Sequence, residues 1–150
     1  MELTKNFFLS EFLKSQTASR LGIDNTPTPE HVECLIALCE NVLQPLRNMY
    51  GKSIIITSGY RSEELNKALR GSSKTSQHCK GQAADIDTTN DNADLFFMIK
   101  RHLPYDQLVW EYGDHKNPQW IHVSFKEKGN RRQTLRVTRQ NGKSVYEEMA

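Results

Sequence analysis

The sequence predicts an α+β fold, and two observations carry this prediction. Helical patterns fill most of the first third of the chain, whereas the rest consists mainly of short strands with one long helix between them. A chain of 150 residues can bury a sizeable core, so we expect a single domain over residues 1–150. Apolar residues make up 37% of the chain and its mean hydropathy is -0.68, which is typical of a soluble protein.

The longest predicted helix begins after Thr28. This residue is a good N-cap, and Pro29 suits the first helical position. Apolar residues then recur at helical spacing from Val32 to Met49, which predicts a face packed in the core. Pro45 lies inside this pattern and should kink the helix about one turn earlier.

Beyond this helix the pattern changes to short strands. Residues 53–58 contain three consecutive isoleucines, which predicts a strand buried on both faces. Ser62 can cap a short helix from residue 63 to about residue 70, and a longer helix is expected from about residue 91 to residue 102. Asn141-Gly142 is a strong hairpin signal. The further strands are expected at residues 83–86, 107–111, 119–125, 134–138 and 143–146, which together favour a mostly antiparallel sheet.

The charge distribution argues against a nucleic-acid partner. The net charge of +2 comes from 20 basic and 18 acidic residues, so no strong attraction to a polyanion is expected. Basic residues do gather near the C-terminus, and we interpret them as a solvated face. A role in holding an anionic polymer is the alternative. These residues are Lys126, Lys128, Arg131, Arg132, Arg136 and Arg139.

The cysteines and the N-terminus indicate a reducing compartment. Cys34, Cys39 and Cys79 are an odd number without a disulfide framework, so we expect free thiols. The N-terminus has no cationic stretch followed by a long apolar run, and no membrane span is visible. We therefore expect cytoplasmic synthesis of a monomer that does not insert into membranes, with any export depending on another protein or on cell lysis.

A candidate metal site is formed by His78, Asp85 and His122. Two imidazoles and one carboxylate suit a catalytic zinc, which uses three protein ligands and keeps a fourth position open for water. Asp85 follows two small alanines in an apolar setting, where a carboxylate is costly without a cation. The alternatives are a capping carboxylate at Asp85 and a half-exposed strand histidine at His122.

Hydrolysis at such a site also needs a cation for the developing oxyanion and a general base. Arg61, in a tight turn after the predicted strand at residues 53–58, is the best cation, unless it pairs on the surface with a neighbouring glutamate. Glu111, at the end of the strand before His122, is the best base, and Asp114 and His115 are alternatives in the following loop.

Two further polar residues flank the candidate ligands. Ser76 could bind a substrate carboxylate or simply cap its own loop. Asp87 shares a predicted strand face with Asp85 and could support the site.

The spacing Ser76-x-His78-x-x-Gly81-x-Ala83-x-Asp85, followed by Trp120-Ile121-His122, resembles the zinc D-Ala-D-Ala carboxypeptidase family of metallopeptidases. The resemblance is greatest to the short, single-domain branch common in phages and prophages. Ser58-Gly59-Tyr60-Arg61-Ser62 is similar to the segment that carries the substrate-polarising arginine in that family. Counting also an N-terminal Phe-x-Leu-Ser-Glu-Phe segment and Asn25-Thr26-Pro27, the resemblance runs from about residue 5 to residue 125.

This resemblance implies a hedgehog-like α+β fold and a single zinc ion held by His78, Asp85 and His122. It also implies that Arg61 stabilises the tetrahedral intermediate and that Ser76 contacts substrate. Some members place the catalytic glutamate three residues before the last histidine. Gln119 stands there in this chain, so Glu111 would have to serve instead.

The implied substrate is the peptide portion of peptidoglycan. The leading hypothesis is a zinc peptidase, acting as a D-Ala-D-Ala carboxypeptidase or as an endolysin-type endopeptidase that reaches the cell wall after lysis or holin-dependent release. The alternative is a zinc-stabilised module of a phage particle or of the wall, with little or no hydrolytic activity.

Overall fold

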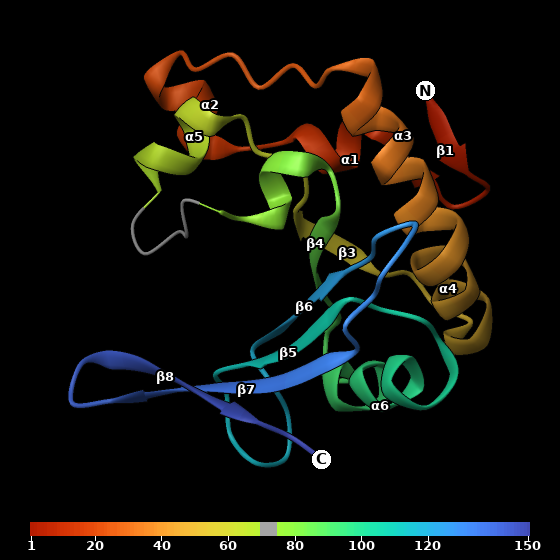
Figure 1. Ribbon diagram of the computed structural model, residues 1–150, viewed down its shortest axis with the longest axis vertical. Coiled ribbons are helices and arrows are strands. Elements are labelled where there is room, and N and C mark those ends of the chain that lie inside the picture. The colour runs from red at the N-terminus through yellow and green to blue at the C-terminus, as the bar shows by residue number, and fades with distance from the viewer. Residues whose placement is uncertain (70–74) are drawn as a thin grey trace.

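The computed structural model describes residues 1–69 and 75–150 (Figure 1). Within these ranges the centre of the fold is a six-stranded sheet with the order β3-β4-β6-β5-β7-β8. Neighbouring strands are antiparallel except β5 and β7, which run parallel. The α+β prediction is thus confirmed. The strands are Ile55–Ser58 (β3), Ala83–Asp87 (β4), Gln107–Glu111 (β5), Trp120–Ser124 (β6), Gln133–Gln140 (β7) and Lys143–Glu148 (β8).

The two faces of the sheet have different environments because side chains alternate along each strand. Leu108 and Trp110 of β5 and Ile121 of β6 point into the main hydrophobic core. The helix α6 (Asn92–His102) contributes to this core, and the ring of its Phe96 lies 5.2 Å from the ring of Trp110. The opposite face carries the polar residues of the same strands and forms the floor of a cleft.

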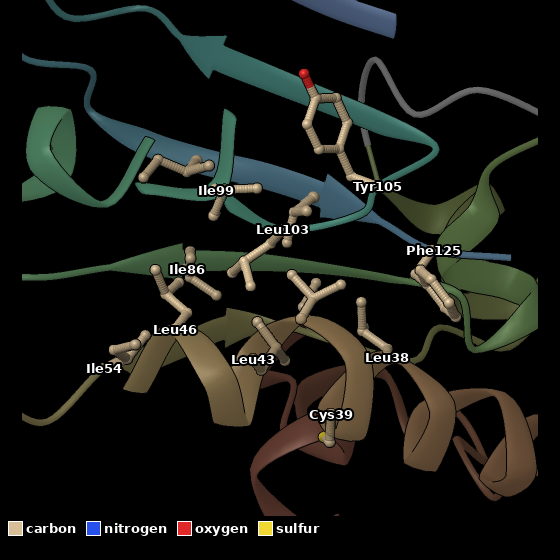
Figure 2. Packing of buried hydrophobic residues seen from close by; sticks show 14 of the residues in the cluster. Leu38, Cys39, Leu43, Leu46, Ile54, Ile86, Ile99, Leu103, Tyr105 and Phe125 are labelled. Carbon is tan, nitrogen blue, oxygen red and sulfur yellow. The ribbon is translucent and has the colours of Figure 1, made fainter. Parts of the chain in front are cut away.

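The predicted long helix is present, with a distortion near Pro45. It consists of α3 (Pro29–Leu38), a π-helical turn η1 (Cys39–Leu43) and α4 (Gln44–Tyr50). The proline has no N–H to donate, and the turn before it is wide, so the N–H of Gln44 donates to the carbonyl of Cys39. Figure 2 shows Leu43 and Leu46 of this helix facing Ile86 of β4, so the bent helix closes the core.

Small elements precede this helix along the chain. The two-stranded pair β1 (Glu2–Thr4) and β2 (Phe7–Phe8) leads into α1 (Leu9–Leu13) and α2 (Gln16–Leu21). Phe12 of α1 is fully buried in the core. Figure 1 shows these elements at the same end of the molecule as α5, away from the hairpin of β7 and β8.

The prediction of a strand buried on both faces at residues 53–58 was wrong. The strand β3 is shorter and lies at the edge of the sheet, and Ile55 is 56% exposed. An apolar run indicates burial only if both faces are covered, and the face of β3 that carries Ile55 is open to solvent.

The segment after β3 supplies part of the site. Ser62 caps α5 (Glu63–Ala68), because its Oγ accepts from the N–H of Leu65 at 3.2 Å. The expected end of this helix near Arg70 and the polar loop at residues 71–74 lie outside the described residues. The chain then forms a short 3₁₀ helix, η2 (Gln77–Lys80), before β4.

The predicted hairpin around Asn141-Gly142 is confirmed, and it extends beyond the rest of the sheet in Figure 1. Its strand β7 pairs with β5, so the hairpin belongs to the same sheet as the site. The basic residues before it are more than a solvated face. Arg131 binds the buried carboxylate of Asp106 at 2.7 Å, and Arg132 donates to the carbonyl of Leu103 at 2.9 Å.

Two other predictions concern the thiols and the membrane. The three cysteines are free, with Cys39 buried and the other two half-buried. Among the helices of the described residues, none combines the length and the apolar character that a membrane span requires.

Candidate metal centre

The three candidate ligands lie together on the cleft face of the sheet. Asp85 of β4 and His122 of β6 are direct cross-strand partners, so their side chains are neighbours. His78 comes from η2 and reaches the same point. The Nδ1 of His122 lies 3.1 Å from Oδ1 of Asp85, and the Nε2 of His78 lies 3.4 Å from the same oxygen. One ligand atom from each residue falls within 4.8 Å of the others.

This geometry and donor set fit one zinc ion. Tetrahedral zinc with ligand distances of about 2.0–2.2 Å requires ligand atoms roughly 3.3–3.6 Å apart. The two distances to Asp85, 3.1 and 3.4 Å, are close to this requirement. The side chains of Asp85, His122 and His78 are 17%, 13% and 3% exposed and line the cleft, so a cation between them would be largely shielded from solvent.

The ring of His78 is held in an orientation that suits metal binding. Its Nδ1 is 2.7 Å from the carbonyl oxygen of Gly59, and this contact requires Nδ1 to carry the proton. The lone pair of Nε2 therefore faces Asp85 and is free for a metal. Ser76 supports the same segment, since its Oγ accepts from the N–H of His78 at 3.2 Å, and it also lines the cleft.

The charges at the site favour an ionised aspartate and a neutral His78. Burial alone would raise the pKa of Asp85, but the two histidines beside its carboxylate, His78 and His122, hold the pKa well below its usual range. Burial lowers the pKa of His78, although Asp85 opposes this shift. A carboxylate and a neutral imidazole are the forms that bind a metal.

Glu111 lines the same cleft, which has a volume of about 1020 Å³. Glu111 pairs with Trp120 across the hairpin of β5 and β6, and Val109 pairs with His122. Glu111 is therefore a diagonal neighbour of His122 on one face. Burial raises the pKa of Glu111 to about 7, opposed by the charge of His122. A carboxyl with such a pKa can both accept and release a proton near neutral pH.

The two loop alternatives to Glu111 lie elsewhere. The carboxylate of Asp114 accepts from the N–H groups of Lys116 and Asn117 at 2.9 Å, so it holds a turn together. His115 is exposed, and neither residue is among the described residues that line the cleft. Of the three candidates for the base, Glu111 is the one that the fold brings to the metal cluster.

Arg61 also lines the cleft, and its Nε is buried without a hydrogen-bond partner. Burial lowers the pKa of its guanidinium, and the nearby charge of Asp85 opposes that shift. No ion pair of Arg61 is found within the described residues, so the alternative of a surface pair with a neighbouring glutamate is not observed. An unpartnered guanidinium beside a metal cluster is available to a substrate oxygen.

Asn25 positions the turn that carries Arg61, a role that the residue pattern alone did not reveal. Its Nδ2 donates to the carbonyls of Leu13 and Tyr60, each at 3.1 Å, and its Oδ1 accepts from the N–H of Ser62 at 2.7 Å. These three bonds connect the N-terminal loop to both sides of Arg61. The only signal in the sequence was the presence of Asn25 in one of the segments that carry the resemblance.

Two other polar residues, Asp87 and Gln119, lie outside the metal cluster. The carboxylate of Asp87 accepts from the N–H of Thr88 and from the side chain of Asn92, at the start of α6. Gln119 lies in an adjoining pocket of about 550 Å³ rather than in the main cleft. Among the described residues, no hydrogen bond or ion pair joins Asp87 or Gln119 to the candidate ligands.

The fold and the site together define the class of this protein. It is an α+β protein with a candidate mononuclear metal centre at the floor of a cleft. Residues 5–124 match the Peptidase M15 family, and the chain belongs to that family. This match confirms, at the level of the family, the resemblance found in the sequence. Members of the family are zinc-dependent. A comparison with curated proteins found no match. The family match ends before β7, so the C-terminal hairpin lies outside the matched residues.

Proposed function

We propose that this protein is a zinc peptidase that hydrolyses bonds in the stem peptides of peptidoglycan, as a D-Ala-D-Ala carboxypeptidase or as an endolysin-type endopeptidase. The observation that carries the proposal is the convergence of His78, Asp85 and His122 with Glu111 in one cleft. Membership of a zinc-dependent peptidase family supports the reaction type. The protein would meet this substrate after lysis or holin-dependent release.

The proposed reaction gives a task to each of the candidate site residues described above. His78, Asp85 and His122 would hold a zinc ion, which would supply Lewis-acid polarisation and a lowered pKa for bound water. Glu111 in its ionised form would take a proton from the water as its oxygen bonds to the carbonyl carbon, and would pass that proton to the leaving amine as the C–N bond breaks. The guanidinium of Arg61 donates to the oxygen of the attacked carbonyl as negative charge develops there. The hydroxyl of Ser76 binds a carboxylate of the substrate.

Gln119 stands where some relatives carry the catalytic glutamate, and this substitution favours a second candidate function. If Glu111 does not replace that residue, the protein would be a zinc-stabilised module of the cell wall or of a phage particle. A peptidase and a non-catalytic module would bind the same amount of zinc, but only the peptidase would turn over substrate. Zinc content and turnover must therefore be measured on the same sample.

The test is release of products from a peptide ending in D-Ala-D-Ala and from purified peptidoglycan, followed by mass spectrometry. We expect release by the zinc-loaded protein and none after chelation. Glu111→Gln should lower kcat by roughly 100-fold or more, the range for loss of a general base, while one equivalent of zinc stays bound. Glu127→Gln, at an exposed glutamate outside the cleft, is the matched control and should keep full activity.

Two outcomes would contradict the proposal. One equivalent of zinc with no release above the level of Glu111→Ala would favour the non-catalytic module. A wild-type protein that binds no zinc, or whose zinc content is unchanged by His78→Ala, would exclude the metal centre itself.

A further inference from the structure

The C-terminal hairpin forms one wall of the cleft, although it lies outside the residues that match the family. In the sheet, Glu111 pairs with Val137 of β7, and Val137 pairs with Tyr146 of β8. Tyr146 thus lies two strands from Glu111 in the same row, about 10 Å away between Cα atoms. Burial and the charge of Glu111 raise the pKa of Tyr146, which agrees with this proximity. The hairpin therefore reaches the reaction centre.

Tyr112 connects this hairpin to the centre of the sheet. It directly follows Glu111 and has a φ of 52°, a left-handed conformation that is uncommon for a residue other than glycine. Its hydroxyl is 2.7 Å from Oγ of Ser144 in β8, and its ring centre is 5.5 Å from that of Trp120. Contacts on two sides hold the ring at the boundary between the cleft and the adjoining pocket.

Arg139 of β7 adds a positive charge to this group. Its guanidinium carbon lies 5.2 Å from the ring centre of Tyr112, and it lines both the cleft and the adjoining pocket. Arg131, the other arginine on this side, is already paired with Asp106. No carboxylate of the described residues lies within 4 Å of the Arg139 guanidinium. Arg139 is thus the available cation on this side.

The cleft therefore has an available guanidinium on each side of the metal cluster. Arg61 follows the edge strand β3, and Arg139 lies on β7, with β4, β6 and β5 between them. A peptide lying across these strands would pass the metal cluster and reach both cations. A carboxylate is the group that a guanidinium binds best among peptide functional groups.

We propose that Arg139, supported by Tyr112 and Ser144, forms a second binding subsite for a carboxylate of the peptide substrate, away from the bond that is cleaved. This inference rests on the proposed peptidase function and makes the substrate class more specific: peptides with an acidic residue or a free terminal carboxylate at one defined position. Arg139 is a specificity-determining residue in this proposal, and Tyr112 and Ser144 position it.

The test measures binding without turnover, using zinc-loaded protein that carries Glu111→Gln. The probes are blocked alanine hexapeptides with a central D-Ala-D-Ala bond, in which one glutamate, or one glutamine as its neutral counterpart, is moved through the other positions. Calorimetry should show that glutamate binds about tenfold more tightly than glutamine at one position, as expected for a hydrogen bond to a charged group. Adding Arg139→Gln should abolish this preference, and Arg139→Lys should restore only part of it.

Arg101→Gln is the matched control. Arg101 is also an exposed arginine over an aromatic ring, 5.3 Å from the centre of Phe97, but it lies on α6 away from the cleft. This variant should keep the full preference, and the two variants should melt within about 2 °C of each other, since both change a surface residue. The subsite would be overturned if the preference for glutamate persisted in the Arg139→Gln variant. It would also be overturned if the protein with Arg139 in place showed no preference for glutamate at any position. Cleavage by the wild-type protein is scored separately: a preference without cleavage would reject the peptidase function and leave the carboxylate subsite standing.

Discussion

Gly81 is the residue that allows His78 to sit against the candidate metal centre. Its φ of +75° closes the short helix η2, and a Cβ at this position would lie 2.4 Å from the carbonyl oxygen of His31. Glycine avoids both the left-handed strain and this collision. The position of the His78 backbone therefore depends on Gly81, although Gly81 has no side chain that could bind a metal or a substrate.

Gly81→Ala should destabilise the protein and loosen the metal site. We expect a loss of roughly 2–4 kcal/mol in the free energy of unfolding, because backbone strain adds to a collision with main-chain atoms. Urea unfolding measures this loss, and competition with a zinc chelator should show a weaker affinity for the metal.

Gly129→Ala separates the two causes. Gly129 also has a φ of +75°, but a Cβ there would meet no atom within 4 Å. This variant should lose only about 1–2 kcal/mol and should keep its zinc affinity, since it suffers the strain alone. Equal effects of the two substitutions would show that the contact with His31 has no role in holding the site.

The turn between β3 and α5 is the element that presents Arg61. Asn25 binds both sides of it, and the N–H of Tyr60 donates to the carbonyl of Phe12 at 2.8 Å. Gly59 packs so closely on Phe12 that a Cβ would lie 2.6 Å from its Cα. The orientation of Arg61 thus depends on a loop and a helix far away in the sequence.

Asn25→Ala should reduce catalysis without removing the metal. It leaves two carbonyls and one N–H without their partner, so we expect a loss of about 2–3 kcal/mol in stability. Arg61 would lose its fixed orientation, and kcat should fall roughly tenfold while zinc content stays at the wild-type level. Activity assays and metal analysis on the same sample check this result.

Asn41→Ala is the matched control for Asn25→Ala. The side chain of Asn41 donates to the carbonyl of Ala37 on an exposed helix face, at 2.8 Å. Its removal should leave kcat unchanged. If Asn25→Ala also had normal turnover, the connection between Asn25 and Arg61 would have no catalytic role.

For the molecule as a whole, Asp106 joins the C-terminal hairpin to the rest of the sheet. It is fully buried and accepts from the main-chain N–H and the guanidinium of Arg131, and Lys126 lies 3.5 Å away. Burial alone would raise the pKa of Asp106, but the hydrogen bonds from Arg131 outweigh burial and lower the pKa to about 2.

This depressed pKa predicts how stability depends on pH. The carboxylate contributes about 2 kcal/mol, because each pKa unit corresponds to about 1.4 kcal/mol. The contribution is complete above the ordinary pKa of 3.8 and is lost as the pH falls from there toward about 2. Asp106→Asn should unfold more easily at neutral pH and should lose less stability between pH 4 and pH 2 than the wild type, as measured by urea unfolding at each pH.

Glu127→Gln again serves as a control, since it removes an exposed carboxylate from the same connection between β6 and β7. Its pH dependence should follow that of the wild type. If the curve of Asp106→Asn had the wild-type slope in this acid range, another group would be responsible for the acid sensitivity.

The local patterns predicted most elements of the fold but not their surroundings. Thr28 and Pro29 marked the start of the long helix, and Asn141-Gly142 marked the hairpin, because caps and turns depend on adjacent residues. The strand at residues 53–58 was misjudged because its position at the sheet edge depends on strand order. The parallel pairing of β5 with β7 depends in the same way on contacts between distant segments.

The sequence by itself determined the identity of the candidate ligands and the family, because two histidines, one aspartate and the small residues around them have a specific spacing. Only the tertiary structure decided which acid reaches them and what forms the other wall of the cleft. Glu111 lies in the cleft because the strand register places it on the same face as His122, whereas Asp114 lies in the loop after β5 and does not line the cleft. The hairpin reaches Glu111 for the same reason. Register between strands results from packing across the whole core, so no short stretch of sequence encodes it.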